Sequence, residues 1–317
     1  MMKNIGLIIE LDNGKIKETN FGMITLARAK DTQLFAFVMD ADANVLKKDL
    51  ASFGITKIVD ISLAKGRENN PVVRAKAIIK AIKAYSISVV FGLSTARGKD
   101  LLPRMAALLD VPLVMDCFYV DLEQNLVKTS RYSGKTIATL KVTGRVLVFG
   151  VRPNAVEPVK AQVSAEILKF DGTGLVSRDL TVIKTGEKDK SIKINLPEAD
   201  VIIAGGRGMK NGENFALLFR CAEKLNAAVG ASRVAVDSGW VPYSMQVGQT
   251  GEKVSPRVYI ACGISGSIQH FAGMKTSGLV IAINTDENAA IMSNCDYYVK
   301  ADVLETITKL TELLENG

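Results

Sequence analysis

The chain has 317 residues, of which 48% are hydrophobic, 6% aromatic and 23% charged. This length favours two domains with cores of their own and excludes a small fold held by disulfides, and the composition argues against a disordered chain. The net charge of +7 makes nucleic acid the first partner class to consider.

The positive charge belongs to the first part of the chain. Residues 1–190 contain 29 basic and 20 acidic side chains, a balance of +9, whereas residues 191–317 contain 11 and 13, a balance of −2. The basic side chains stand singly, and few aromatic residues lie among them to stack on bases. We therefore expect a solvated surface or a docking face for an acidic protein, and no nucleic acid. A basic protein that binds nucleic acid or nucleotides is the alternative from another functional class.

The cysteines and the apolar segments indicate a cytoplasmic protein. Cys117, Cys221, Cys262 and Cys295 form no Cys-x-x-Cys pair, so we predict no metal site and four buried thiols in a reducing compartment. The first apolar stretch, 5–11, is too short for a signal peptide. No uninterrupted apolar run approaches the ~18 to 20 residues that cross a bilayer, so we do not expect a membrane-embedded chain.

Short apolar runs alternate with amphipathic stretches in the first part of the chain. The runs are typical of buried parallel strands and lie at 5–11, 34–39, 57–61, 88–93 and 112–116. The stretches with helical spacing lie at 45–53, 72–85 and 99–109. Asn70 is predicted to cap the second helix, with Pro71 in its first turn. The alternation predicts a parallel α/β sheet.

After residue 116 the chain becomes rich in β-type residues, punctuated by glycine and proline. We interpret these segments as antiparallel strands that extend the first domain, at 126–130, 136–141, 146–151 and 161–170. The polar stretch 184–191 has no apolar periodicity and marks the linker. We therefore place the first, partner-contacting domain at 1–188 and the second domain at 189–317.

The second domain repeats the alternation of strand and helix. Its strands are predicted at 201–204, 229–236, 258–261, 279–283 and 297–299. Its helices are predicted at 214–225, 267–272 and 303–314. The predicted fold class is α/β with two domains, an N-terminal α/β domain with added antiparallel strands and a C-terminal Rossmann-like domain with a parallel sheet.

Two glycine-rich segments come close to nucleotide-binding motifs without matching them. Between Gly92 and Gly98 there is one residue too many for a Walker A loop, and Asp100 replaces the hydroxyl that would hold magnesium. Gly206 and Gly208 match the first two glycines of a dinucleotide-binding fingerprint, but Asn211 stands where the third glycine belongs. Neither segment predicts a nucleotide site by its motif.

Glycine and polar residues gather where the strands of the second domain end. They lie at 205–208, 230–233, 246–251, 263–270 and 284–286. The carboxyl ends of parallel strands form the edge at which open α/β sheets bind ligands. Five such segments at one edge predict a site for a polar ligand.

The charges in these segments indicate an anionic ligand. Ser265 is placed to cap a helix that begins near Gly266, where a phosphate can approach free backbone donors. Arg207 and Arg233 supply positive charge in a domain whose balance is −2. A ligand that carries a diphosphate fits this pattern. His270, the only histidine, is interpreted as a capping or core residue, because no acidic residue completes a serine-hydrolase triad nearby. We predict no catalytic residues.

The same segments resemble a known family. In order and spacing they are similar to the flavin domain of the electron transfer flavoprotein alpha subunit. The segments are GGRGMKNGENFALLFRCAEKLN (205–226), AVGASRVAVDSGWVPYSMQVGQTG (228–251), YIACGISGSIQHFAGM (259–274) and IAINTD (281–286). The first domain resembles this family through STARGKDLLPRMAALLDVPLVMD at 94–116, where the false Walker loop is a family feature. The chain departs from the family at Ser238 and Trp240, where we expect Ala and Phe.

The resemblance implies an electron carrier rather than a substrate-converting enzyme. It implies one FAD on the second domain, a heterodimer with a beta subunit, and a place in fatty acid oxidation. Electrons would pass from acyl-CoA dehydrogenases or related donors to a membrane quinone oxidoreductase. The related alternative is an electron-bifurcating flavoprotein in which NADH and a second FAD bind to the beta subunit.

The resemblance also implies roles at the flavin ring. Arg233 would lie against the isoalloxazine, and Thr250 would hydrogen-bond the ring nitrogen that is protonated on reduction. Gln269 and His270 would face the pyrimidine end, and residues 247–249 would line the ring. The full set of implied cofactor-binding residues is Arg207, Ser232, Arg233, Val247, Gly248, Gln249, Thr250, Ser265, Gly266, Ser267, Ile268, Gln269, His270, Asn284 and Asp302.

The rest of the set would hold the other parts of FAD. Arg207 and residues 265–268 would hold the pyrophosphate and ribityl groups, and Asn284 and Asp302 would take the adenosine end. A fixed guanidinium beside a ring that gains negative charge raises its reduction potential, so Arg233 is expected to tune the flavin.

Overall fold

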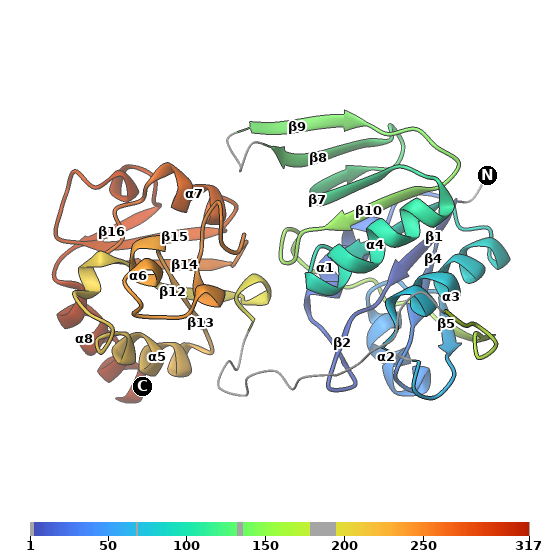
Figure 1. Cartoon of the computed structure of the whole chain (residues 1–317), viewed down its shortest axis with the longest axis horizontal. Coiled ribbons are helices and arrows are strands. Elements are labelled where there is room, and N and C mark those ends of the chain that lie inside the picture. The colour runs from blue at the N-terminus through green and yellow to red at the C-terminus, as the bar shows by residue number, and fades with distance from the viewer. Residues whose placement is uncertain (1–2, 68, 132–135, 178–194, 317) are drawn as a thin grey trace. The chain divides into compact units, whose positions relative to one another are not determined.

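The structure is a computed structural model that describes residues 3–67, 69–131, 136–177 and 195–316. The chain divides into two compact units (Figure 1). Unit 1 comprises Met1–Ser130 and Ile137–Glu187, and unit 2 comprises Arg131–Thr136 and Lys188–Gly317. The predicted linker at 184–191 and the predicted boundary at 188 lie outside the described residues.

Unit 1 is built on one large sheet and a small antiparallel hairpin. The strands of the sheet are β1 (Lys3–Ile8), β4 (Thr32–Val38), β5 (Lys57–Ser62), β6 (Val89–Leu93), β7 (Leu113–Asp121), β8 (Leu126–Arg131), β9 (Thr136–Lys141), β10 (Leu147–Val151) and β11 (Glu166–Asp171). The hairpin consists of β2 (Leu11–Asp12) and β3 (Lys15–Ile16). The strands of the sheet follow the order β11-β5-β4-β1-β6-β10-β7-β8-β9. The chain adds β4 and β5 on one side of β1 and then β6 on the other, so the order reverses between β1 and β6.

The structure confirms the α/β fold class and corrects the direction of two strands. β8 pairs antiparallel with β7, as predicted. The segments predicted as antiparallel strands at 146–151 and 161–170 instead contain β10, which is parallel to β6 and β7, and β11, which is parallel to β5. All of β10 is buried, which is typical of a strand inside a parallel sheet, whereas β11 is a partly exposed edge strand.

Four helices cover the two faces of this sheet. Helices α1 (Thr19–Ala27) and α2 (Ala43–Ser52) pack on one face, and α3 (Pro71–Ala84) and α4 (Ala96–Leu109) pack on the other. Asn70 caps α3 as predicted, because its side chain accepts hydrogen bonds from the backbone N–H groups of Val72 and Val73. Helix α1 was not among the predicted helices, because its residues have almost no amphipathic periodicity and include the buried Asn20.

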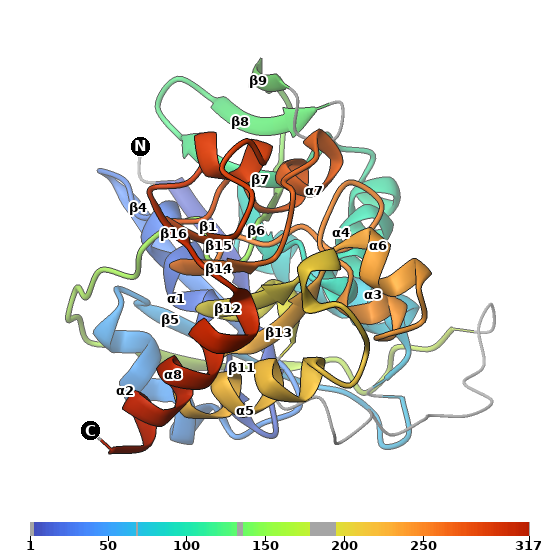
Figure 2. The same ribbon diagram turned by 90° about the vertical axis from the view of Figure 1, so that its left-hand side faces the viewer.

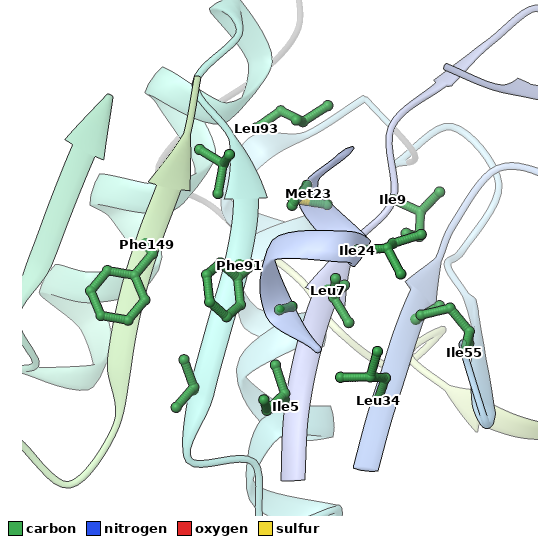
Figure 3. Packing of buried hydrophobic residues seen from close by; sticks show 14 of the residues in the cluster. Ile5, Leu7, Ile9, Met23, Ile24, Leu34, Ile55, Phe91, Leu93 and Phe149 are labelled. Carbon is green, nitrogen blue, oxygen red and sulfur yellow. The ribbon is translucent and has the colours of Figure 1, made fainter. Parts of the chain in front are cut away.

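The core of unit 1 follows from the alternation of strand side chains. Ile5 and Leu7 of β1 point into the core beneath α1, while Ile8 belongs to the core on the opposite face. Figure 3 shows Met23 and Ile24 of α1 over Ile5 and Leu7. Both faces of the sheet are therefore closed by aliphatic packing.

Unit 2 contains a second, parallel sheet. Its strands are β12 (Val201–Gly205), β13 (Ala228–Ala231), β14 (Val258–Cys262), β15 (Leu279–Asn284) and β16 (Tyr297–Lys300). They follow the order β13-β12-β14-β15-β16, and each neighbouring pair is parallel. The order reverses between β12 and β14. In open α/β sheets this reversal, at the carboxyl ends of the strands, is where ligands bind.

Helices and short 3-10 turns complete unit 2. The helices are α5 (Phe215–Leu225), α6 (Arg233–Asp237), α7 (Ile268–Met274) and α8 (Val303–Asn316). The 3-10 turns are η1 (Leu196–Glu198), η2 (Arg207–Met209), η3 (Tyr243–Met245) and η4 (Ala290–Ser293). α5 and α8 lie side by side on one face of the sheet, as Figure 2 also shows. α7 and η4 contribute to the core on the opposite face.

One predicted strand of unit 2 changes into a helix. The strand predicted at 229–236 ends at Ala231, and Arg233 begins α6. The three valines of 229–236 favoured a strand, but Val234 is exposed and Ala235 is buried in the core shared with α5, so tertiary packing overrides local propensity.

Two further expectations concern the whole chain. No described helix is long and apolar enough to cross a membrane. All four cysteines are free; Cys117, Cys221 and Cys262 are buried, and Cys295 is half-buried rather than buried as expected.

Candidate functional site

A cavity of about 830 Å³ opens at the carboxyl edge of the sheet in unit 2. It is lined by the loops that follow β12, β13, β14 and β15, so it lies where the strand order reverses. Its volume is within the roughly 300 to 1,000 Å³ of small-molecule and cofactor sites.

Thirteen of the fifteen residues implied by the resemblance line this cavity. They are Arg207, Ser232, Arg233, Val247, Gly248, Gln249, Thr250, Ser265, Gly266, Ser267, Gln269, His270 and Asn284. Ile268 and Asp302 do not line it. The Ile268 side chain is 69% exposed at the start of α7. The Asp302 carboxylate lies 3.0 Å from Lys210 Nζ and accepts the backbone N–H of Leu304, and these hydrogen bonds lower its pKa.

Several lining residues were not among the predicted set. They are Gly208, Val234, Gln246, Gly263, Ile264, Asp286 and Ala289. Most of them lie inside the glycine-rich and polar segments at the strand ends. The position of these segments therefore predicted them, although the resemblance to the family did not name them.

Glycines allow the loops after β12 and β14 to approach each other. The Gly208 N–H donates to the Gly263 carbonyl at 2.9 Å. A Cβ on Gly208 would lie 2.7 Å from the Gly263 Cα, and a Cβ on Gly206 would lie 2.4 Å from its carbonyl oxygen. The near-fingerprint after β12 therefore serves backbone-to-backbone packing of the two loops that floor the cavity.

The end of β14 leads into a turn and then α7. Gly266 has φ +77°, and a Cβ there would lie 2.5 Å from the Ile291 backbone nitrogen. The prediction that Ser265 caps the next helix is wrong, because Ser267 is the N-cap and its hydroxyl accepts the His270 N–H. The turn at Gly266 delays the helix by two residues, which leaves Ser265 exposed at the cavity.

The loop from 246 to 252 forms another wall. Gln246 is 2% exposed, and its Nε2 donates to the Thr250 hydroxyl at 2.9 Å. Tyr243 donates to the Thr250 carbonyl. The Gln249 N–H donates to the Gln269 carbonyl at 2.8 Å, which ties this loop to α7. Because Thr250 Oγ1 accepts from Gln246, its own hydrogen is available to a ligand acceptor.

Two arginines provide positive charge at the cavity. Arg207 belongs to η2 and is exposed. Arg233, the first residue of α6, is 69% exposed, and its Nε lies 3.1 Å from Asp237 Oδ2. This exposed ion pair orients the guanidinium rather than neutralising it, since such pairs are worth little in water. Asp286 is the acidic residue among those that line the cavity.

Asn284 organises the loop after β15. Its Nδ2 donates to the Ile264 carbonyl at 3.0 Å, and its Oδ1 accepts the Asp286 N–H at 3.0 Å. The side chain thus links two walls of the cavity.

Two buried polar atoms at the cavity have no hydrogen-bond partner among the described residues. One is the hydroxyl of Ser232, which precedes α6, and the other is Nδ1 of His270. The other ring nitrogen of His270 lies 2.9 Å from the Tyr259 hydroxyl. Burial lowers the pKa of His270 from 6.5 to about 4, so the imidazole is neutral at pH 7. Unsatisfied buried polar groups are costly in a folded protein, so both atoms are available to hydrogen-bond a bound molecule.

Unit 1 has a smaller cavity, of about 190 Å³, at the reversal between β1 and β6. Four of the five charged side chains that line it are in ion pairs: Glu10 with Lys17, Asp40 with Arg74, and Asp100 with Arg104. Gly98 is required by packing, because a Cβ there would lie 1.7 Å from the Leu93 carbonyl oxygen.

The fold and the larger cavity define a doubly wound α/β protein with a site for an anionic, nucleotide-sized ligand. Comparison with known proteins gives the family. The model described as "Electron transfer flavoprotein FAD-binding domain" matches residues 195–275, and that described as "Electron transfer flavoprotein domain" matches residues 5–173. The chain belongs to the electron transfer flavoprotein alpha subunit family, as the resemblance indicated.

Full-length relatives agree with this assignment. "Probable electron transfer flavoprotein subunit alpha, mitochondrial" of Caenorhabditis elegans is 35% identical over 97% of this chain and 92% of the relative. "Electron transfer flavoprotein subunit alpha" of Pseudomonas aeruginosa is 37% identical over 96% and 97% of the two chains. The protein of the same name from Thermoanaerobacterium thermosaccharolyticum is 36% identical over 98% and 97%.

The residues of the cavity fit FAD, the cofactor of this family's C-terminal domain. The positive charges of Arg207 and Arg233 are complementary to its negative diphosphate and to the electron-rich reduced ring. The unpartnered Ser232 hydroxyl and His270 Nδ1 can meet its polar atoms, and Thr250 has a free hydroxyl hydrogen. The cavity's volume is that of a cofactor site.

Proposed function

We propose that this chain is the FAD-carrying alpha subunit of a heterodimer whose second chain is an electron transfer flavoprotein beta subunit. The observation that carries the proposal is the cavity at the strand reversal of unit 2, with two exposed arginines and two unpartnered buried polar atoms. The ring nitrogen Nε2 of the cavity's histidine faces Tyr259 rather than a serine hydroxyl, which favours an electron carrier over a hydrolase.

Bound FAD would supply the redox chemistry, taking up and releasing electrons at its isoalloxazine ring. Arg233 would place a positive charge beside the ring, with Asp237 restricting the guanidinium to one side of α6. Thr250 would donate its hydroxyl hydrogen to a ring nitrogen, because its oxygen is held by Gln246. Arg207 and residues 265–267 would bind the diphosphate and ribityl groups. Asn284 would border the adenosine end.

We further propose acyl-CoA dehydrogenases or related enzymes as donors, a membrane quinone oxidoreductase as acceptor, and a role in fatty acid oxidation in the cytoplasm. The support is the family, together with four free cysteines, which suit a reducing compartment. The bifurcating alternative, with NADH and a second FAD on the beta subunit, depends on residues of that partner.

Co-expression with a beta subunit tests the proposal. We expect a yellow heterodimer with one FAD on this chain that is bleached by an acyl-CoA plus its dehydrogenase. Bleaching by NADH, with two FAD per heterodimer, would favour the bifurcating alternative. A colourless complex, or salt-dependent retention on DNA, would refute the proposal.

A further inference from the structure

The only histidine of the chain is held by a tyrosine from the neighbouring strand. Tyr259 lies in β14, is 0% exposed, and places its hydroxyl 2.9 Å from His270 Nε2. His270 lies in α7, is 5% exposed, and lines the cavity of unit 2. Its backbone N–H donates to the Ser267 hydroxyl. His270 is thus held by one hydrogen bond at its backbone and another at its ring.

The hydrogen bond to Tyr259 decides which ring nitrogen of His270 carries the imidazole hydrogen. Within the described part of the chain, the Tyr259 hydroxyl hydrogen-bonds Nε2 of His270. Burial raises the pKa of Tyr259 well above its usual value, so the phenol oxygen keeps its hydrogen. If the hydroxyl donates, Nε2 accepts and the imidazole hydrogen resides on Nδ1. The reverse arrangement would leave the tyrosine hydrogen and the Nδ1 lone pair both without partners in the core, at greater cost.

Nδ1 then carries a hydrogen with no partner. It is buried and forms no hydrogen bond of normal geometry to any described residue. A backbone hydrogen bond to Val247 raises the pKa of His270 against the larger effect of burial, but its geometry falls short of a normal hydrogen bond. Val247 also lines the cavity. A rigid donor beside a cofactor cavity is suited to an acceptor atom of the ligand.

We infer that Tyr259 is a positioning residue that fixes the neutral Nδ1–H form of His270 and so reserves that hydrogen for a carbonyl oxygen of the isoalloxazine. The identity of the acceptor rests on the proposed function; the form of the imidazole does not. Tyr259 is not among the residues that line the cavity, so it acts through the imidazole.

Nitrogen NMR of the free chain tests the form of the imidazole directly. Because His270 is the only histidine, full-length chain labelled with ¹⁵N-histidine and purified without a histidine tag gives one imidazole signal set. We expect Nδ1 at a protonated position and Nε2 at the position of an accepting nitrogen. In Tyr259→Phe the Nδ1–H form loses its dominance, while Tyr297→Phe, which changes an exposed tyrosine, leaves the signals unchanged.

FAD binding tests the acceptor. After assembly with unlabelled beta subunit, Tyr259→Phe should raise the FAD Kd by roughly threefold to tenfold, the range for one neutral hydrogen bond, and shift the flavin potential. A protonated Nε2 in the wild type, or the same form in Tyr259→Phe, would overturn the inference about Tyr259. The expected NMR signals with an unchanged Kd and potential would overturn the donor role. The expected signals in a chain that takes up no FAD would refute the proposed function and leave the positioning of His270 standing.

Discussion

The two units place the same topological feature at the centre of a parallel sheet. The strand order reverses between β1 and β6 in unit 1 and between β12 and β14 in unit 2. In unit 1 this edge leaves about 190 Å³, and four of the five charged side chains along it are in ion pairs. In unit 2 it leaves about 830 Å³, and two buried polar atoms along it have no hydrogen-bond partner among the described residues. The reversal of strand order supplies a place for a ligand, and the loops decide whether it is used.

Glycines produce much of this difference. In unit 1, Gly98 brings α4 against the end of β6, so the helix itself occupies the edge. In unit 2, Gly263 and Gly266 both have positive φ and turn the chain after β14 away from the edge before α7 begins. The first arrangement fills the site, and the second opens it.

Adding a side chain to the turn after β14 should have the largest effect on FAD binding. In Gly266→Ala, a left-handed alanine and its contact with the Ile291 backbone should together cost about 2 to 5 kcal/mol. We expect the FAD content of the purified complex to fall at least tenfold. Gly174→Ala, where a Cβ meets nothing within 4 Å, should keep its FAD. Full FAD content in Gly266→Ala would show that this turn does not shape the site.

Removing an ion pair in unit 1 should affect stability without affecting the cofactor. Arg152 is 5% exposed and binds both carboxylate oxygens of Asp116, at 2.8 and 2.5 Å. Arg152→Met should lower the free energy of unfolding of unit 1 by about 2 to 3 kcal/mol, since Asp116 is partly exposed. The double variant with Asp116→Asn should recover part of this loss in urea denaturation. Loss of FAD from Arg152→Met would contradict the separate roles of the units.

Acid should destabilise unit 2 through its histidine. The unfolded chain binds a proton at His270 near pH 6.5, whereas the folded chain does so only near pH 4, so stability is lost as the pH falls through this window. Between pH 6.5 and 5 we expect a loss of about 1.5 kcal/mol. The loss should be absent in His270→Gln, as measured by urea denaturation at both pH values. Equal losses in both proteins would place the titrating group elsewhere.

Removing one charge from the cavity should give the smallest effect. Arg233→Ala should lower the flavin reduction potential by about 40 mV, which corresponds to the ~1 kcal/mol of a charge at ~4 Å in water. The low figure follows from the 69% exposure of Arg233. Arg220→Ala removes an equally charged, 61% exposed side chain from α5, outside the cavity lining, and should leave the potential unchanged. Equal shifts in both variants would exclude a specific role for Arg233.

Local signals in the sequence predicted local structure well. The Asn-Pro start of α3 fixes a helix terminus by capping, and the polar residues at strand ends lie at one edge because parallel strands share a direction. The directions of β10 and β11 depend on partners far along the chain, which periodicity does not encode. Helix α1 could not be predicted from its pattern, because it buries the polar Asn20. The hydrogen bonds of Asn20 to the Glu10 backbone, which make this burial possible, exist only in the folded unit.

The details of the site required the fold as well. Ser267 rather than Ser265 caps α7 because the left-handed turn at Gly266 intervenes. Asp302 lies outside the cavity because its carboxylate binds Lys210 and the first turn of α8. The contact between Tyr259 and His270 joins two segments eleven residues apart, and no motif predicts it.

Hydrogen–deuterium exchange with and without FAD tests the central claim, that the ligand edge of unit 2 and not that of unit 1 holds the cofactor. The complex with the beta subunit would be compared after removal and return of FAD. We predict slower exchange in peptides covering 205–209, 246–252 and 263–270 when FAD is bound, and unchanged exchange in 92–100. Protection of 92–100, or unchanged exchange at all three segments of unit 2, would contradict this account.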